Sequence, residues 1–229
     1  MLYTIGDLHL SFGADKPMDV FGREWEGHAE KLRAGFSRLT AEDTCVICGD
    51  LTWGINMEAC KNDFKFIDGL PGKKIILKGN HDFWWQTAAK TKAFFEQNGI
   101  KTIEVLHNNC FFYNKNVAIC GTRGWSCTEE GKTHDRKMVR REAMRLEASL
   151  KAAGDAEEKL CFLHYPPLFG GARLDELIDV MKRYGVRRCW YGHLHGAGRA
   201  LAFEGEMEGI EYRLISADHV GFSPVLVRE

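Results

Sequence analysis

Side chains that can bind metal ions follow five short apolar runs of this 229-residue sequence. Two of the groups are pairs separated by one residue, so both side chains of a pair point to the same face of an extended chain. Imidazole nitrogens suit zinc, iron, nickel and copper, whereas carboxylate and carbonyl oxygens suit manganese and magnesium. A mixed set therefore indicates a site for two transition-type ions, with manganese, iron and zinc as candidates. The residues are Asp7, His9, Asp50, Asn80, His164, His193 and His195.

The apolar runs before these residues are typical of buried β-strands, because a strand covered on both faces shows no polar alternation. In open α/β sheets, side chains at the carboxyl ends of such strands converge on one crevice. Five of the nine histidines lie at these ends, which supports a shared site. The runs cover residues 2–5, 45–48, 75–77, 161–163 and 189–191.

Helical and strand patterns alternate along the chain. Residues 102–120 differ, because three short strands joined by polar turns predict an antiparallel segment between two halves. We predict an α/β fold, a two-sheet mixed β-sandwich flanked by helices, as a single domain over residues 1–229. Asn56 is expected to cap the second helix. Helices are expected at residues 25–39, 56–68, 84–97 and 135–153, and further strands at residues 210–217 and 224–228.

The composition is that of an ordinary soluble globular protein, with 45% hydrophobic and 28% charged residues. The formal net charge of −1 gives no overall attraction to nucleic acid or to anionic lipid, so neither is expected as a partner. No apolar stretch approaches the ~20 residues of a membrane helix, and the first residues do not read as a signal peptide. We therefore expect a cytoplasmic protein acting on a small substrate; its oligomeric state stays open.

The eight cysteines do not indicate a disulfide framework. Most of them lie within apolar runs, where free thiols behave as small hydrophobic side chains. The spacing Cys45-x-x-Cys48 can bind zinc or carry out redox chemistry in other proteins. However, residues three apart on a strand point to opposite faces, and the sequence has no second such pair. We interpret both cysteines as buried thiols.

Taken in order, the candidate ligands resemble the motifs of the calcineurin-like metallophosphoesterase superfamily. The resemblance extends from residue 7 to residue 195, and its motifs are specific in combination. It implies a two-sheet α/β sandwich with the site at the strand ends, which agrees with the fold predicted from the strand and helix pattern. The matching motifs are Asp7-x-His9, Gly49-Asp50, Gly79-Asn80-His81-Asp82, His164 and Gly192-His193-x-His195.

The resemblance also implies the role of each residue. It implies a phosphoesterase in which a hydroxide bridging two Mn, Fe or Zn ions attacks phosphorus in line with the leaving oxygen. Asp50 would bridge the ions and, with His81, be catalytic; His81 would stabilise the transition state or protonate the leaving alkoxide. The implied ligand sets are Asp7, His9, Asp50 and His195 for one ion, and Asp50, Asn80, His164 and His193 for the other.

One position departs from the family pattern. Many members have a second aspartate three residues after the bridging one, and this aspartate orients the equivalent of His81. Here the position is occupied by Trp53. Loss of the carboxylate removes one cause of a raised histidine pKa. Either His81 has another partner, or its role as an acid is weaker.

Substrate contacts are expected from Asn80, His81 and Arg123. Arg123 follows a strand and could reach a substrate phosphate, but a solvated loop arginine is an equally good interpretation. The run Phe83-Trp84-Trp85 could line a pocket for an aromatic or nucleoside leaving group, although packing in the core is favoured. Trp53 poses the same choice.

The expected function is hydrolysis of a phosphomonoester or a small phosphodiester. A nuclease of the same superfamily is one alternative, but it should show a basic groove or an added DNA-binding domain. A non-catalytic metal-binding scaffold is another, but it should have lost ligands. Substrate choice would depend on rim loops, expected at residues 11–28, 53–57 and 121–135, and the first of these suggests a lid.

Overall fold

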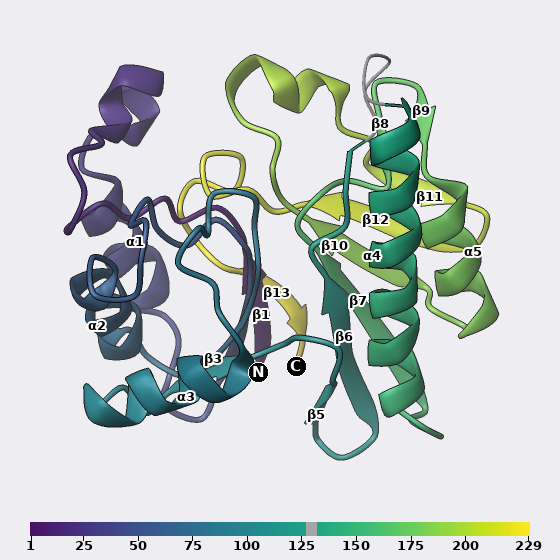
Figure 1. Ribbon diagram of the computed structural model, residues 1–229, viewed down its shortest axis with the longest axis horizontal. Coiled ribbons are helices and arrows are strands. Elements are labelled where there is room, and N and C mark those ends of the chain that lie inside the picture. Colours follow the sequence, from purple (N-terminus) through teal and green to yellow (C-terminus); the bar gives the residue numbers. More distant parts are fainter. Residues whose placement is uncertain (127–131) are drawn as a thin grey trace.

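Two mixed β-sheets lie face to face at the centre of the molecule, and helices cover their outer faces (Figure 1). The computed structural model describes residues 1–126 and 132–229. The arrangement confirms the predicted two-sheet α/β sandwich flanked by helices.

The first sheet has the strand order β13-β1-β2-β3-β4. Strands β1 to β4 run parallel, and β13 pairs antiparallel with β1. Because β4 continues this parallel sheet, the prediction of an antiparallel segment over residues 102–120 was wrong for its first strand. The strands span Leu2–Ile5 (β1), Thr44–Cys48 (β2), Lys73–Leu77 (β3), Ile103–Val105 (β4) and Val225–Arg228 (β13).

The second sheet has the order β11-β12-β10-β7-β6-β5. Its four central strands are parallel, and the edge strands β11 and β5 are antiparallel to their neighbours. The strands span Phe111–Tyr113 (β5), Val117–Thr122 (β6), Glu158–Leu163 (β7), Arg188–Tyr191 (β10), Gly205–Met207 (β11) and Ile210–Leu214 (β12). A separate hairpin pairs Leu168–Phe169 (β8) with Ala172–Arg173 (β9).

Helices α1 to α3 lie on the outer side of the first sheet, and α4 and α5 on that of the second (Figure 1). No helix within residues 1–126 or 132–229 is long and apolar enough to cross a lipid bilayer. The α-helices span His28–Phe36 (α1), Lys61–Gly69 (α2), Ala88–Gln97 (α3), Lys132–Ala152 (α4) and Asp175–Arg183 (α5). Short 3-10 helices span Met18–Phe21 (η1), Arg23–Trp25 (η2) and Gly196–Leu201 (η3).

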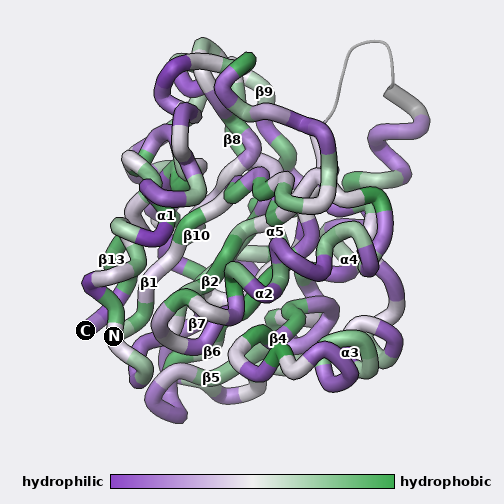
Figure 2. Tube along the Cα trace, turned by 90° about the vertical axis from the view of Figure 1, so that its left-hand side faces the viewer, coloured by the Kyte–Doolittle hydropathy of each residue, from purple (hydrophilic) through white to green (hydrophobic). Residues whose placement is uncertain are grey.

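The facing sides of the two sheets share one apolar core, and Figure 2 shows hydrophobic residues concentrated along central strands such as β2 and β10. Phe162 of β7 stacks on Trp190 of β10 with ring centroids 5.1 Å apart. Cys48 belongs to this core, whereas Cys45 of the same strand packs on the helical side. Both are buried free thiols on opposite faces, as predicted.

Three helices begin later than the sequence pattern predicts, at residues 28, 61 and 88 instead of 25, 56 and 84. Local hydrogen bonds explain two of these differences. The Asn56 side chain accepts a hydrogen bond from the N–H of Ala59, so it caps a turn that precedes α2. The Thr87 hydroxyl accepts from the N–H of Lys90 and thereby caps α3.

Candidate metal centre

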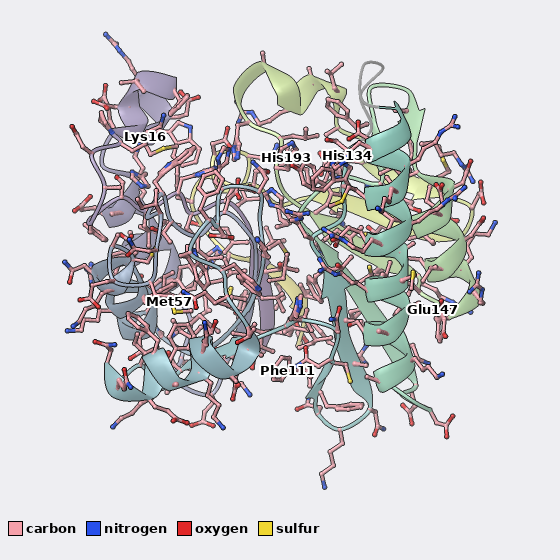
Figure 3. The ribbon with its side chains drawn as sticks, in the orientation of Figure 1. Lys16, Met57, Phe111, His134, Glu147 and His193 are labelled. Carbon is pink, nitrogen blue, oxygen red and sulfur yellow. The ribbon has the colours of Figure 1, made fainter. Side chains whose placement is uncertain are left out.

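All seven predicted ligands lie at the carboxyl ends of their strands and come together at one end of the molecule. Figure 3 shows His193 at this end, between the two helical layers. The donor atoms of six ligands form two groups, and within each group they lie within 4.8 Å of one another. Asn80 joins the second group, because its Oδ1 lies 2.6 Å from His164 Nε2. The groups are Asp7, His9 and His195, and Asp50, His164 and His193.

Asp50 stands between the two groups. Its Oδ2 lies 3.8 Å from His9 Nε2 and 3.6 Å from His164 Nε2. Its Oδ1 accepts a hydrogen bond of 2.8 Å from the backbone N–H of His81, which fixes the carboxylate plane. One carboxylate oxygen therefore faces a ligand from each group, as a bridging ligand must.

Hydrogen bonds on the far side of two imidazoles set their orientation. His164 Nδ1 lies 3.0 Å from the carbonyl oxygen of Cys48, so this nitrogen carries the proton and Nε2 keeps its lone pair. His195 Nδ1 lies 2.8 Å from Asp218 Oδ1, and its Nε2 faces Asp7 Oδ1 at 3.4 Å. Both rings thus present Nε2 to the centre of the site.

Burial and neighbouring charges shift the pKa values of the ionisable groups in the site. Burial, followed by the nearby Asp7, raises the pKa of Asp50 to about 8. Burial alone would lower the pKa of His195, but Asp7 and Asp218 outweigh it and raise that pKa to about 10. Burial, together with His164, lowers the pKa of His193 to about 3. Metal binding would therefore compete with protons for these buried groups.

The donor set fits metal ions. His9 Nε2 and His195 Nε2 lie 3.3 Å apart, and the buried Nδ1 of His9 has no hydrogen-bond partner among the described residues. Buried carboxylates and imidazoles that converge in this way are suited to a bound metal cation, which would compensate their charge and occupy their lone pairs.

The backbone at several candidate ligands is held in the left-handed region, with φ of 60° at Asp7, 46° at His9, 49° at Asp50 and 73° at His193. Non-glycine residues rarely adopt this conformation, and it concentrates at functional sites. The surrounding hydrogen bonds explain how it is maintained. Asp7 N, for example, donates to Gly49 O at 2.9 Å, and His9 N donates to Asp50 O at 2.9 Å.

Two glycines are required by the close approach of carboxylates. A Cβ at Gly79 would lie 2.0 Å from Asp50 Oδ1, and a Cβ at Gly192 would lie 2.3 Å from Asp7 Oδ2. Neither glycine has a positive φ. The reason for these two glycines is therefore space for a ligand, whereas Gly49 has a positive φ of 84° as in a tight turn.

Gly192→Ala is expected to displace Asp7 and to weaken metal binding by the first group at least about 10-fold, because its ligand must move. Gly198→Ala is the matched control, since a Cβ there meets no atom within 4 Å. Calorimetric titration with Mn²⁺ measures the difference. Equal manganese affinity in the two variants would contradict the close approach of Asp7 to Gly192.

Two aspartates outside the ligand groups hold the site in place. The carboxylate of Asp82 accepts hydrogen bonds from the backbone of Asp50, Leu51 and Gly79 and from Trp84 Nε1, at 2.7–3.0 Å. Asp218 binds His195 and the backbone N–H of Gly196. The sequence did not predict the role of Asp218, because no motif marks its position in the tail. The neighbouring His219 contacts Glu204 and is not in either ligand group.

Asp82→Asn is expected to lower the free energy of unfolding by about 2–4 kcal/mol, because an amide presents hydrogens to some of the four donors. Urea unfolding of the metal-free protein measures the change. The control is Asp155→Asn, since Asp155 is exposed. Equal unfolding midpoints would show that the four hydrogen bonds contribute little.

His81 lies beside the ligand groups and packs against aromatic rings. Its Nε2 is 4.0 Å from Asp50 Oδ2, and its ring centroid is 4.3 Å from that of Trp53. Burial, with His164, lowers the pKa of His81. Trp53 also stacks on His9, with centroids 5.0 Å apart. The residue in place of the usual aspartate thus contacts His81 through its indole face.

The other predicted contacts have mixed outcomes. The Arg123 side chain is only 13% exposed and lies 3.8 Å from Glu142, so it is not a solvated loop arginine; its contact with substrate stays a prediction. Trp84 is buried in the core, as favoured, whereas Phe83 is exposed. The rim prediction at 121–135 lies in part outside the described residues, since 127–131 are not described.

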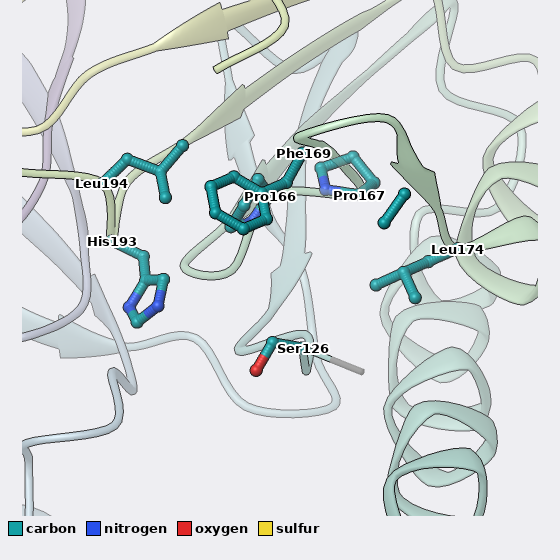
Figure 4. A pocket seen from close by; sticks show the side chains of 8 residues that line it. Ser126, Pro166, Pro167, Phe169, Leu174, His193 and Leu194 are labelled. Atoms are coloured by element: carbon teal, nitrogen blue, oxygen red, sulfur yellow. The ribbon is translucent and has the colours of Figure 1, made fainter. Parts of the chain in front are cut away.

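Two apolar pockets adjoin the ligands. One, of about 300 Å³, is lined by His9, Met18, Phe21, Trp25, Trp53, His81, His195 and Gly196. The other, of about 190 Å³, is reached from His193 (Figure 4). The second is lined mainly by Pro166, Pro167, Phe169, Ala172, Leu174 and Leu194, with Ser126 opposite.

Comparisons with known proteins point to one family. The model that describes calcineurin-like phosphoesterases matches residues 2–197. No curated protein matches the sequence significantly. The fold is similar to that of the phosphopantetheinyl hydrolase from Mycobacterium tuberculosis, with a TM-score of 0.60 and 13% identity over 99% of this chain and 96% of that one. It is also similar to a protein of unknown function from Aquifex aeolicus, with a TM-score of 0.53 and 15% identity over 98% and 94% of the chains.

Proposed function

This chain belongs to the calcineurin-like phosphoesterase family, and we propose that it is a metal-dependent hydrolase of a phosphomonoester or a small phosphodiester. Members of the family typically use two metal ions, and this chain has two candidate ligand groups. The observation that supports the proposal most is the position of Asp50 between the groups, with His81 beside it and outside both.

The candidate ligands would divide between two ions of Mn, Fe or Zn. When bound, the ions supply an activated water as the nucleophile and neutralise charge on the phosphate oxygens. The proposed ligands are Asp7, His9, Asp50 and His195 for one ion, and Asp50, Asn80, His164 and His193 for the other.

The protein's own groups orient the metal ligands and protonate the leaving oxygen. Asp218 and the Cys48 carbonyl hold His195 and His164 with Nε2 toward the centre. His81 Nε2 faces the same centre, from which it can donate a hydrogen bond to the leaving oxygen and transfer its proton as the ester bond breaks. The Trp53 ring excludes water from one face of His81.

A small substrate is favoured over nucleic acid. The pocket beside His81 has a volume of about 300 Å³, at the lower end of the range for small-molecule sites. The net charge of −1 offers no general attraction to a polyanion. The nuclease alternative therefore has less support than the phosphatase.

Hydrolysis of p-nitrophenyl phosphate and of its bis ester tests the proposal. The protein loaded with Mn²⁺, Zn²⁺ or Fe²⁺ is expected to cleave at least one of them, to lose activity with a chelator and to regain it when metal returns. Single-stranded DNA serves as the nuclease substrate in parallel. A protein that binds two ions and cleaves none of the three would contradict an enzymatic role.

A further inference from the structure

The pocket of about 300 Å³ beside His81 has aromatic walls, and apart from His9 and His195 its lining residues are not candidate metal ligands. We propose that this aromatic pocket holds the leaving group of the substrate, and that the leaving group is a flat aromatic ring system such as an aryl group or a nucleobase. The inference rests on the proposed function and deepens it by assigning a substrate class. The lining comprises His9, Met18, Phe21, Trp25, Trp53, His81, His195 and Gly196.

The walls of the pocket are already in place. Trp25 and Met18 are only 2% and 5% exposed, so they are held by the core. Trp53 Nε1 donates to the Met18 sulfur at 3.0 Å, which joins the segment before α1 to the loop after β2. Trp25 lies edge-on to His195, with centroids 5.5 Å apart. A ring that entered would find aromatic surfaces without rearrangement of the core, and aromatic surfaces favour aromatic ligands.

The two ends of the pocket differ in chemistry. The imidazoles of His9, His81 and His195 cluster at one end, with the His9 ring centroid 5.8 Å from that of His81 and 5.1 Å from that of His195. His9 and His195 are also candidate metal ligands, and the rest of the lining is mostly apolar. Such a division suits a molecule with a phosphate attached directly to an apolar group. Phe21 lines the pocket and has 52% of its surface exposed, so its ring is accessible to a ligand that enters from solvent.

A cation lies beside two of the lining rings. The ammonium of Lys16 is 4.9 Å from the Trp53 ring centroid and 5.3 Å from that of Phe21. Figure 3 shows Lys16 at the same end of the molecule as His193. Its charge attracts a phosphorylated ligand toward the pocket, and the aromatic faces keep the ammonium there.

The position of His81 decides which part of the substrate enters. His81 lines the pocket and also directs Nε2 toward Asp50. A proton from His81 reaches only an oxygen next to this pocket, and the oxygen that takes a proton during hydrolysis is that of the leaving group. The organic group on that oxygen therefore occupies the aromatic pocket.

Binding of phosphonates tests this without turnover. Benzylphosphonate, methylphosphonate and an alkylphosphonate with as many carbons as the benzyl compound are titrated by calorimetry into the manganese-loaded protein. Benzylphosphonate is expected to bind at least about 10-fold more tightly than methylphosphonate and more tightly than the alkyl compound. Equal binding of the benzyl and alkyl compounds would overturn the aromatic class.

Phe21→Ala and Phe112→Ala are the matched variants, because Phe21 is 52% and Phe112 is 53% exposed. Phe112 lies on β5, far along the chain from the pocket lining. Phe21→Ala is expected to reduce the preference for benzylphosphonate several-fold, and Phe112→Ala to leave it unchanged. Trp53→Ala should abolish the preference and Trp53→Phe should restore much of it, with metal content measured for both.

The outcomes separate this inference from the proposed function. If the protein cleaves p-nitrophenyl phosphate but binds benzylphosphonate and methylphosphonate equally, the pocket assignment is wrong and the function stands. The pocket assignment is also wrong, and the function stands, if Phe21→Ala and Phe112→Ala show the same preference for benzylphosphonate. If neither phosphonate binds and no ester is cleaved, both proposals fail.

Discussion

Asp50→Asn is expected to remove both metal ions together and to reduce phosphatase activity at least about 10³-fold. One carboxylate oxygen of Asp50 faces a ligand from each group, so loss of its charge affects both positions at once. Ions held there would supply several kcal/mol of transition-state stabilisation, which sets the expected loss of rate. Elemental analysis of the purified variant after metal loading, together with p-nitrophenyl phosphate hydrolysis, measures both effects.

His193→Ala is the matched comparison for this experiment. His193 belongs only to the second group, so this variant is expected to keep one ion while Asp50→Asn keeps none. Asparagine is nearly the same size as aspartate, so the loss is not due to a cavity. Full retention of one ion by Asp50→Asn would show that Asp50 does not bridge.

His81→Ala is expected to lower kcat by about 10²- to 10⁴-fold while both ions stay bound, because His81 lies outside both ligand groups. Its side chain is 35% exposed, so the fold should tolerate the change. If His81 protonates the leaving group, the loss will be larger for phenyl phosphate than for p-nitrophenyl phosphate, whose leaving group needs a proton less. Similar losses for the two esters would favour charge stabilisation instead.

His107→Ala controls for the removal of a half-buried histidine, since His107 packs against Trp85 away from the ligand groups. This variant should keep wild-type kcat and metal content. A kcat for His81→Ala equal to that of His107→Ala would remove His81 from the mechanism.

Trp53, which stands where many family members have an aspartate, replaces the carboxylate contact to His81 with an aromatic one. An indole contacts His81 and stacks on His9, and Met18 accepts its N–H. No carboxylate within the described residues forms a hydrogen bond with the His81 side chain, and burial lowers its pKa. Packing against Trp53 thus orients the His81 ring without the usual partner, while the lowered pKa leaves this ring less protonated at neutral pH. The same substitution provides one wall of the aromatic pocket.

Much of the fold was accessible from the sequence because its signals are local. Buried parallel strands appear as short apolar runs, and β1, β2, β3, β7 and β10 lie where those runs predicted them. Helix boundaries were less accurate, because local side-chain hydrogen bonds compete with helical propensity. Residues 84–87 stay outside α3, for example, while the Trp84 indole binds Asp82 in the loop after β3. The sheet to which β4 belongs also depends on partners that its three residues do not specify.

By itself, the sequence determined the family, the two-sheet architecture and the candidate ligands, because residue type and spacing along single strand ends carry that information. Only the tertiary structure decided the distances from Asp50 to a histidine of each group, which residue orients His195, and that Trp25, Met18 and Trp53 line one pocket. Those features join segments far apart in the chain, such as His9 and His195, which are separated by 186 positions. Such pairs arise from the packing of whole sheets, and no local periodicity records them.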